Sequence, residues 1–351
     1  MNDAIPPSAT HAAPPADPRA VHDALLTVDT HIDIPWPEGP DPFLDGTRKV
    51  DLPKMRRGGM AAGCFVAYVP QAVRTPATEQ AAFARATAML ERIHSLAAGA
   101  PGLPARLTIT AAEVARAHQD GALAVIPAVE NGFAIGTDLD RLRRLRALGA
   151  RYLTLTHTGH NALADSANPR ADLKDVAEEH AGLSAFGRVA IAELNRLGML
   201  VDIAHVSRAA MLAAAEASRT PVLSTHSCIR ALCDHPRNLD DTQLDALAAV
   251  GGVVQVTAVS AFLKPRAAPE QVTVEDFADH IDYAVRRIGI AHVGISSDFD
   301  GGGGFSGWND AGDSPNITAA LLRRGYDQGA LALLWGGNFL RLLRIAEEHA
   351  A

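Results

Sequence analysis

Short apolar segments that alternate with helix-like segments dominate the hydrophobic pattern of this chain. Seven of eight such segments are nearly continuous apolar runs, as expected for parallel strands that helices and packed side chains cover on both faces. The predicted strands span about 25–30, 61–69, 122–129, 151–156, 199–204, 221–225, 252–258 and 292–297.

Most of the gaps between these strands contain apolar residues at three- and four-residue spacing, which predicts helices. The clearest are 78–99, 138–149, 184–198, 272–289 and 332–350. Ser184 suits the N-cap of the third helix, and Gly149 and Gly198 suit the C-terminal ends of the second and third. Eight alternations of strand and helix favour a closed (β/α)8 TIM barrel over an open doubly wound sheet. No GxGxxG motif follows the first strand to support the latter.

Residues that can bind a metal or transfer a proton follow six of the predicted strands. They are His31, Asp33, Glu130, His157, His205, His226 and Asp298. Barrel enzymes of this class build their active sites at the carboxyl ends of the strands. The recurrence therefore predicts an enzyme with metal in its site, on a barrel of the metal-dependent hydrolase type.

The residue types and spacing indicate a site for two metal ions. His31 and Asp33 alternate along a strand, so both side chains can reach one ion, and imidazole with carboxylate suits zinc. Each of His205 and His226 alone would more often be a core histidine, but both fall at the same rim. We expect His31, Asp33 and Glu130 to bind one zinc ion. Glu130, His205 and His226 would bind the other, with Glu130 bridging the pair.

The remaining candidates predict the rest of a hydrolytic site. Two metals can share a water and lower its pKa, which supplies hydroxide at neutral pH. Asp298 would transfer the proton to a leaving amine, and His157 would donate a hydrogen bond to the substrate carbonyl. We expect Asp300 to support the site. No Lys-Ser/Thr follows the glycines at 301–304, so they predict a flexible active-site loop rather than a phosphate cradle.

Composition narrows the class of protein and its partners. Apolar residues make up 48% and charged residues 21% of 351, which suits a large globular core. A formal charge of −8 argues against nucleic acid or an anionic membrane as a partner. The three cysteines form no recognisable framework, and residues 1–20 lack the features of a secretory signal. We therefore expect a flexible arm at 1–20, one catalytic domain at 21–351, and a cytoplasmic protein.

Six segments together resemble the renal (membrane) dipeptidase family of zinc peptidases, in a bacterial-type form. They are VDTHIDIP, AVENG, RYLTLTHTGHNALADSA, VDIAHVS, STHSCIRALCDHPRNLDD and HVGISSDFDG, in the family's order from about residue 25 to the C-terminus. The resemblance implies the same ligand sets and the same roles for His157 and Asp298. It further implies that Arg237 binds the substrate's C-terminal carboxylate, with Arg230 as the nearby competitor.

The same resemblance implies the reaction and the assembly. It implies hydrolysis of dipeptides, including those with a C-terminal D-amino acid, and a possible homodimer. The run Val256–Phe262 departs from the aromatic segment usual after the seventh strand. An aromatic wall of the pocket is therefore expected to be missing or replaced.

Two other functions remain open at this point. A hydrolase on the same scaffold could act on an N-acyl amino acid, a lactam or a lactone with the same chemistry and a different pocket. A catalytically silent barrel that binds peptides or metals is the alternative from another class. The complete set of candidate ligands with Asp298 argues against it.

Overall fold

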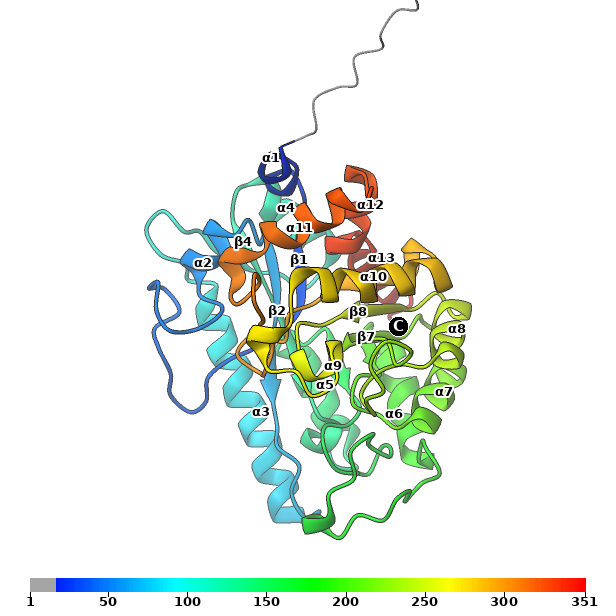
Figure 1. Cartoon of the computed structure of the whole chain (residues 1–351). Helices are drawn as coiled ribbons and strands as arrows, with labels where there is room; N and C mark the ends of the chain where they lie inside the picture. Colours follow the sequence, from blue (N-terminus) through cyan, green and yellow to red (C-terminus); the bar gives the residue numbers. More distant parts are fainter. Residues whose placement is uncertain (1–16) are drawn as a thin grey trace, which may run out of the picture.

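The computed structural model describes residues 17–351, in which helices surround a central sheet of parallel strands (Figure 1). The strands are β1 Val28–Asp33, β2 Ala62–Tyr68, β3 Ala105–Leu107, β4 Leu123–Glu130, β5 Tyr152–Thr154, β6 Leu200–Asp202, β7 Leu223–Ser227, β8 Val253–Val256 and β9 Val293–Ile295. All except β3 correspond to predicted strands. Strand β3 was missed because its three residues, one of them an exposed arginine, carry no apolar run.

Eight of the strands follow one another in a ring, in the order β1-β2-β4-β5-β6-β7-β8-β9. Residues just beyond β9 close it against β1, since Asp298 N donates to His31 O at 3.1 Å and Asp33 N donates to Phe299 O at 3.0 Å. Strand β3 pairs only with the first residues of β4. The architecture is the predicted (β/α)8 barrel, and its closure places Asp298 beside the end of β1.

Helices occupy the connections between the strands. They are α1 Pro18–Asp23, α2 Leu52–Arg57, α3 Pro76–Leu96, α4 Ala111–Gln119, α5 Leu139–Ala147, α6 Ala185–Arg196, α7 Arg208–Ala217, α8 Asp241–Ala249, α9 Ser260–Leu263, α10 Val274–Ile288, α11 Pro315–Arg323, α12 Gln328–Ala332 and α13 Asn338–Glu348. Ser184 caps α6 through the amide of Gly187, as predicted. Residues 1–16 of the predicted arm lie outside the described residues, and α1 begins within the rest of it.

The last predicted helix, 332–350, is interrupted. A wide π-type turn at Leu333–Gly337 separates α12 from α13. The backbone at Gly336 packs so closely under the barrel that an added Cβ would lie 2.5 Å from the carbonyl oxygen of Leu26. The close approach requires glycine there, and the hydrophobic periodicity alone did not reveal the break. None of the helices within residues 17–351 is long and apolar enough to cross a membrane.

Neighbouring helices of the outer layer are tied together by a carboxylate between two arginines. Glu193 on α6 accepts from Arg143 on α5 at 2.7 Å and from Arg196 at 2.7 and 2.8 Å. Its side chain is 9% exposed. The hydrogen bonds from Arg196 and the one from Arg143 lower the pKa of Glu193 to about 2, although burial alone would raise it. The ionised carboxylate therefore stabilises the α5–α6 contact.

Glu193→Gln is expected to lower the free energy of unfolding by about 1 kcal/mol at pH 7. The effect is this small because both arginines are nearly half exposed, so that solvent screens their attraction to the carboxylate. Glutamate in the unfolded chain takes up a proton before the folded one does. The wild type therefore loses this stability as the pH falls from about 4.5 towards 2, and the difference between the two proteins shrinks. Urea unfolding at pH 7, 5 and 3.5 measures it, with the exposed Glu216→Gln on α7 as control. A pH-independent difference would contradict this account.

Candidate active site

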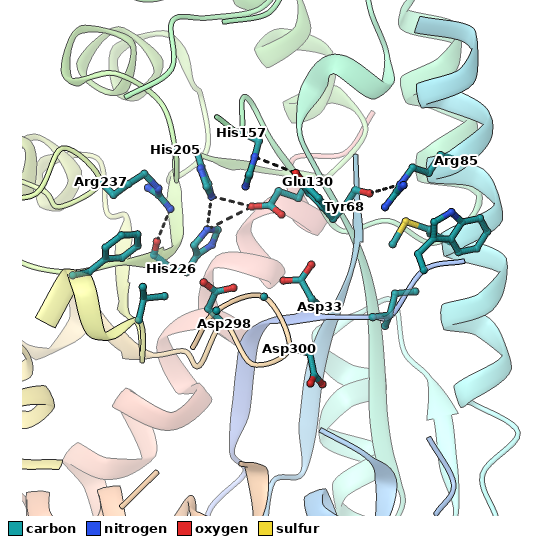
Figure 2. Close-up of a pocket in the computed structure, with 17 residues that line it drawn as sticks. Asp33, Tyr68, Arg85, Glu130, His157, His205, His226, Arg237, Asp298 and Asp300 are labelled. Atoms are coloured by element: carbon teal, nitrogen blue, oxygen red, sulfur yellow. Dashed lines mark hydrogen bonds and ion pairs between the residues drawn. The ribbon is translucent and has the colours of Figure 1, made fainter. Parts of the chain in front are cut away.

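The carboxyl ends of the barrel strands open into a cavity of about 470 Å³, a size typical of small-molecule sites. Six of the seven predicted residues line it (Figure 2). His31 is 1% exposed and lies next to Asp33 and Glu130. The structure therefore brings all seven together.

Glu130 is the last residue of β4, and its carboxylate lies between histidines from different strands. Oε1 is 3.0 Å from His205 Nε2 and 3.5 Å from His226 Nε2. Oε2 is 3.7 Å from His31 Nε2, which in turn is 3.8 Å from Asp33 Oδ2. Two ligands of one tetrahedral zinc ion lie about 3.4 Å apart, so these spacings suit metal binding.

The close groupings differ in part from the predicted ligand sets. Three triads place their ligand atoms within 4.8 Å of one another: His31–Glu130–His226, Glu130–His157–His205 and His31–Asp33–Asp298. Glu130 thus belongs to two triads, as a bridging ligand would. His226 lies with His31 as well as with His205, and both His157 and Asp298 approach as closely as the predicted ligands do. Which of these groups bind an ion stays a prediction.

Burial and mutual charge shape the protonation of the cluster. Burial alone would raise the pKa of Glu130, but His31, His157 and His205 hold that pKa well below its usual value. Burial, with positive neighbours, lowers the pKa of His205 and of His226 well below the usual range. Ionised carboxylate and neutral imidazole are the forms that bind a metal.

The other side of the cluster attracts positive charge. Burial alone would lower the pKa of His31, but Glu130 and Asp33 raise it to about 10. Burial raises the pKa of Asp33, and the neighbouring Glu130 raises it further. Burial likewise raises the pKa of Asp298 to about 7, against the opposing effect of His31. Buried carboxylates this close together need a compensating cation, and a divalent ion would supply it in place of the proton on His31.

Hydroxyl groups behind the site orient two of the histidines. Tyr152 OH donates to the carbonyl of Thr30 at 3.0 Å and lies 3.1 Å from His31 Nδ1, from which it can accept. Thr225 Oγ1 donates to Asp202 at 2.8 Å and lies 2.8 Å from His226 Nδ1. Each contact favours a proton on Nδ1 and leaves Nε2 free to face the cavity.

These supporting residues were not predicted. Asp202 lies in the apolar run MLVDIA, where a lone carboxylate in a predicted buried strand was the available signal. It is fully buried and accepts hydrogen bonds from Thr154, Thr225 and the amide of Ala204. No comparable signal marks Tyr152 or Thr225, because both act through contacts between strands.

The glycine-rich loop passes over the carboxylates. A Cβ at Gly301 would lie 2.1 Å from Asp33 Oδ2 and 2.4 Å from Asp298 Oδ1, so a larger residue there would displace both carboxylates. Asp300 accepts from the amides of Lys49 at 2.8 Å and Val50 at 3.2 Å, and so ties the loop to the segment that follows β1.

The two candidate arginines lie in different surroundings. Arg237 lines the cavity, is 4% exposed and donates from Nη2 to the carbonyl of His226 at 3.1 Å. Its Nε has no hydrogen-bond partner within residues 17–351. Arg230 does not line the cavity and pairs with the exposed Asp234 at 2.8 Å. Three aromatic residues line the cavity, namely Trp36, Tyr68 and Phe262, the last of which belongs to the run after the seventh predicted strand.

Comparison with known proteins identifies the class. The model of the membrane dipeptidase family (peptidase family M19) matches residues 16–351, so the chain belongs to this family. Dipeptidase aclJ of Aspergillus oryzae is 33% identical over 310 residues, which cover 86% of this chain and 71% of that protein. The family and its fold establish a peptide-bond hydrolase of the metallopeptidase type.

Solved structures agree with this assignment. The probable dipeptidase PvdM from Pseudomonas aeruginosa superposes with a TM-score of 0.90 at 27% identity, over 95% of this chain and 98% of that one. A metallopeptidase from Rhodobacter sphaeroides, solved with a phosphinate mimic of the dipeptide L-Ala-D-Ala, has a TM-score of 0.79 at 29% identity. That match covers 92% of this chain and 99% of the other.

Thr225→Val, which removes one hydroxyl without changing the volume, is expected to weaken zinc binding by about 10- to 100-fold. The His226 ring would lose the acceptor that holds its Nδ1 proton. Competition with a chromophoric chelator measures the affinity. Thr257→Val is the matched control, since the Thr257 hydroxyl is buried without a partner within residues 17–351. Equal affinities of the two variants would refute the orienting role.

Proposed function

We propose that this chain is a dipeptidase that uses two zinc ions bridged by Glu130 and that accepts dipeptides with a C-terminal D-amino acid. The division of the Glu130 oxygens between His31 and the pair His205 and His226 carries the proposal. One carboxylate whose two oxygens face different imidazoles can bind two ions at once. The chain also belongs to a family of metallopeptidases, which supports the presence of metal at this site.

In this proposal, His31, Asp33 and Glu130 hold one ion, and Glu130, His205 and His226 hold the other. Metal ions held by these residues would supply Lewis acidity and a hydroxide nucleophile at neutral pH. His157 and Asp298 lie within the same close groupings and serve as substrate-binding and proton-transfer residues rather than ligands.

The protein's own groups position the substrate and move the proton. Arg237, which lines the cavity, binds the C-terminal carboxylate through its guanidinium group. His157 donates a hydrogen bond to the oxygen of the scissile carbonyl and stabilises the charge that develops there. Asp298 takes up on a carboxylate oxygen the proton that the attacking water loses, and delivers it to the nitrogen of the leaving amine.

The tolerance for a D-residue rests on the Rhodobacter sphaeroides relative, which was solved with a mimic of L-Ala-D-Ala. The cavity of about 470 Å³ accommodates such a small ligand. The cytoplasmic location and the homodimer stay predictions.

Hydrolysis of L-Ala-L-Ala, L-Ala-D-Ala and N-acetyl-alanine by zinc-loaded and chelator-stripped protein tests the function. We expect zinc-dependent cleavage of both dipeptides and little of the N-acyl compound. Glu130→Gln is expected to lower kcat/KM by about 10³-fold or more, because nucleophile and Lewis acid both depend on the ions. The exposed Glu216→Gln serves as control.

Other outcomes separate the alternatives. Cleavage of N-acetyl-alanine but of neither dipeptide would favour an amidohydrolase of different specificity. Zinc binding without turnover of any amide would favour a catalytically silent barrel. Near wild-type turnover in a folded Glu130→Gln variant would contradict the bridging role.

Arg237→Met is expected to lower kcat/KM for L-Ala-L-Ala by about 100-fold, because a buried charged partner of the substrate carboxylate is lost. The same variant should change kcat/KM for L-alanyl-L-alaninamide, which lacks that carboxylate, far less. Steady-state kinetics on the two substrates measures the contrast, with Arg230→Met as the matched control. An equal loss on both substrates would show that Arg237 does not read the carboxylate.

A further inference from the structure

A second arginine lies across the cavity from Arg237 and has no role in the proposed reaction. Arg85 is on α3, the helix that follows β2, and it lines the cavity beside Tyr68 and Met89. Arg85 follows β2 in the chain and Arg237 follows β7. These two strands are four positions apart in the ring of eight and therefore lie opposite one another. Figure 2 shows Arg85 on one side of the Glu130 cluster and Arg237 on the other.

The guanidinium of Arg85 is held in place but not neutralised. Its Nε donates to the carbonyl oxygen of Tyr68 at 3.0 Å, and its central carbon lies 5.9 Å from the centre of the Tyr68 ring. It forms no ion pair within residues 17–351, and its side chain is only partly exposed. By contrast, the nearby Arg170 is already paired with Asp172. Arg85 therefore keeps donors for an incoming anion.

The rest of the cavity offers few other sites for an anionic group. Asp33 and Glu130 line it but hold the metal ions in the proposed function, and Asp298 and Asp300 are further carboxylates of the wall. The two guanidinium groups at opposite sides therefore remain as binding groups for carboxylates on a substrate. A ligand with two carboxylates, one at each end, matches this pattern, because an arginine binds a carboxylate with paired donors.

We propose that Arg85 binds a carboxylate in the side chain of the substrate's N-terminal residue, so that the enzyme prefers dipeptides with an N-terminal glutamate or aspartate. The inference rests on the proposed function, in which Arg237 holds the C-terminal carboxylate. With that end fixed and the scissile carbonyl at the Glu130 cluster, the N-terminal residue extends towards Tyr68 and Arg85 (Figure 2). Aromatic and methionine side chains there contact its methylene groups.

Kinetics on isosteric substrate pairs tests the assignment. The wild type is expected to hydrolyse L-Glu-L-Ala with a kcat/KM at least about tenfold above that for L-Gln-L-Ala. Arg85→Met should bring this ratio to about 1, and Arg85→Glu should favour L-Lys-L-Ala over L-Glu-L-Ala. The exposed Arg116→Met on α4, which is outside the cavity, should keep the wild-type ratio.

Each alternative outcome is decisive. A wild-type ratio near 1 overturns the inference without any variant, as does a ratio that Arg85→Met leaves unchanged. A preference for glutamate only at the C-terminal position, seen as faster cleavage of L-Ala-L-Glu than of L-Ala-L-Gln, would also overturn the inference. It would show that Arg85 does not bind the side chain of the N-terminal residue. Equal cleavage of L-Glu-L-Ala and L-Gln-L-Ala overturns this inference but leaves the proposed dipeptidase function standing. If no dipeptide is cleaved, the proposed function and this inference are overturned together.

Discussion

The buried carboxylate of Glu130 is the constraint on which the site depends. An ionised carboxylate removed from water is costly unless charged or hydrogen-bonding partners surround it. The barrel supplies these partners from several strands, with His205 and His226 facing one oxygen and His31 the other. Hydroxyls of Tyr152 and Thr225 behind the histidines hold the rings in the orientation that this arrangement needs. The cluster is thus an assembled whole rather than a set of independent ligands.

The topology of the barrel explains how such distant residues meet. Parallel strands deliver their last residues to one rim, and the segment after β9 closes the ring by pairing with β1. That closure brings Asp298 next to His31 and Asp33, and Gly301 leaves room for both carboxylates. The same ring sets β2 opposite β7, so that the positive groups of Arg85 and Arg237 face each other across an acidic cavity.

Much of this arrangement was predictable because buried parallel strands leave continuous apolar runs, and the residue after each run marks the rim. The same reasoning missed β3, which is too short for a run, and the break at Gly336, which depends on a contact with Leu26. The grouping of the site residues was also only partly predicted, since strand order does not determine which imidazoles approach most closely. Arg85 carried no signal at all, because an arginine on an amphipathic helix is usually solvated.

The central claim is that Glu130 bridges two metal ions. Anomalous diffraction at the zinc edge, on crystals of zinc-loaded protein, tests it most directly. The account predicts two peaks roughly 3.5–4 Å apart, one on each side of the Glu130 carboxylate, near His31 and Asp33 and near His205 and His226. A single peak, or two peaks of which one lies away from Glu130, would contradict it.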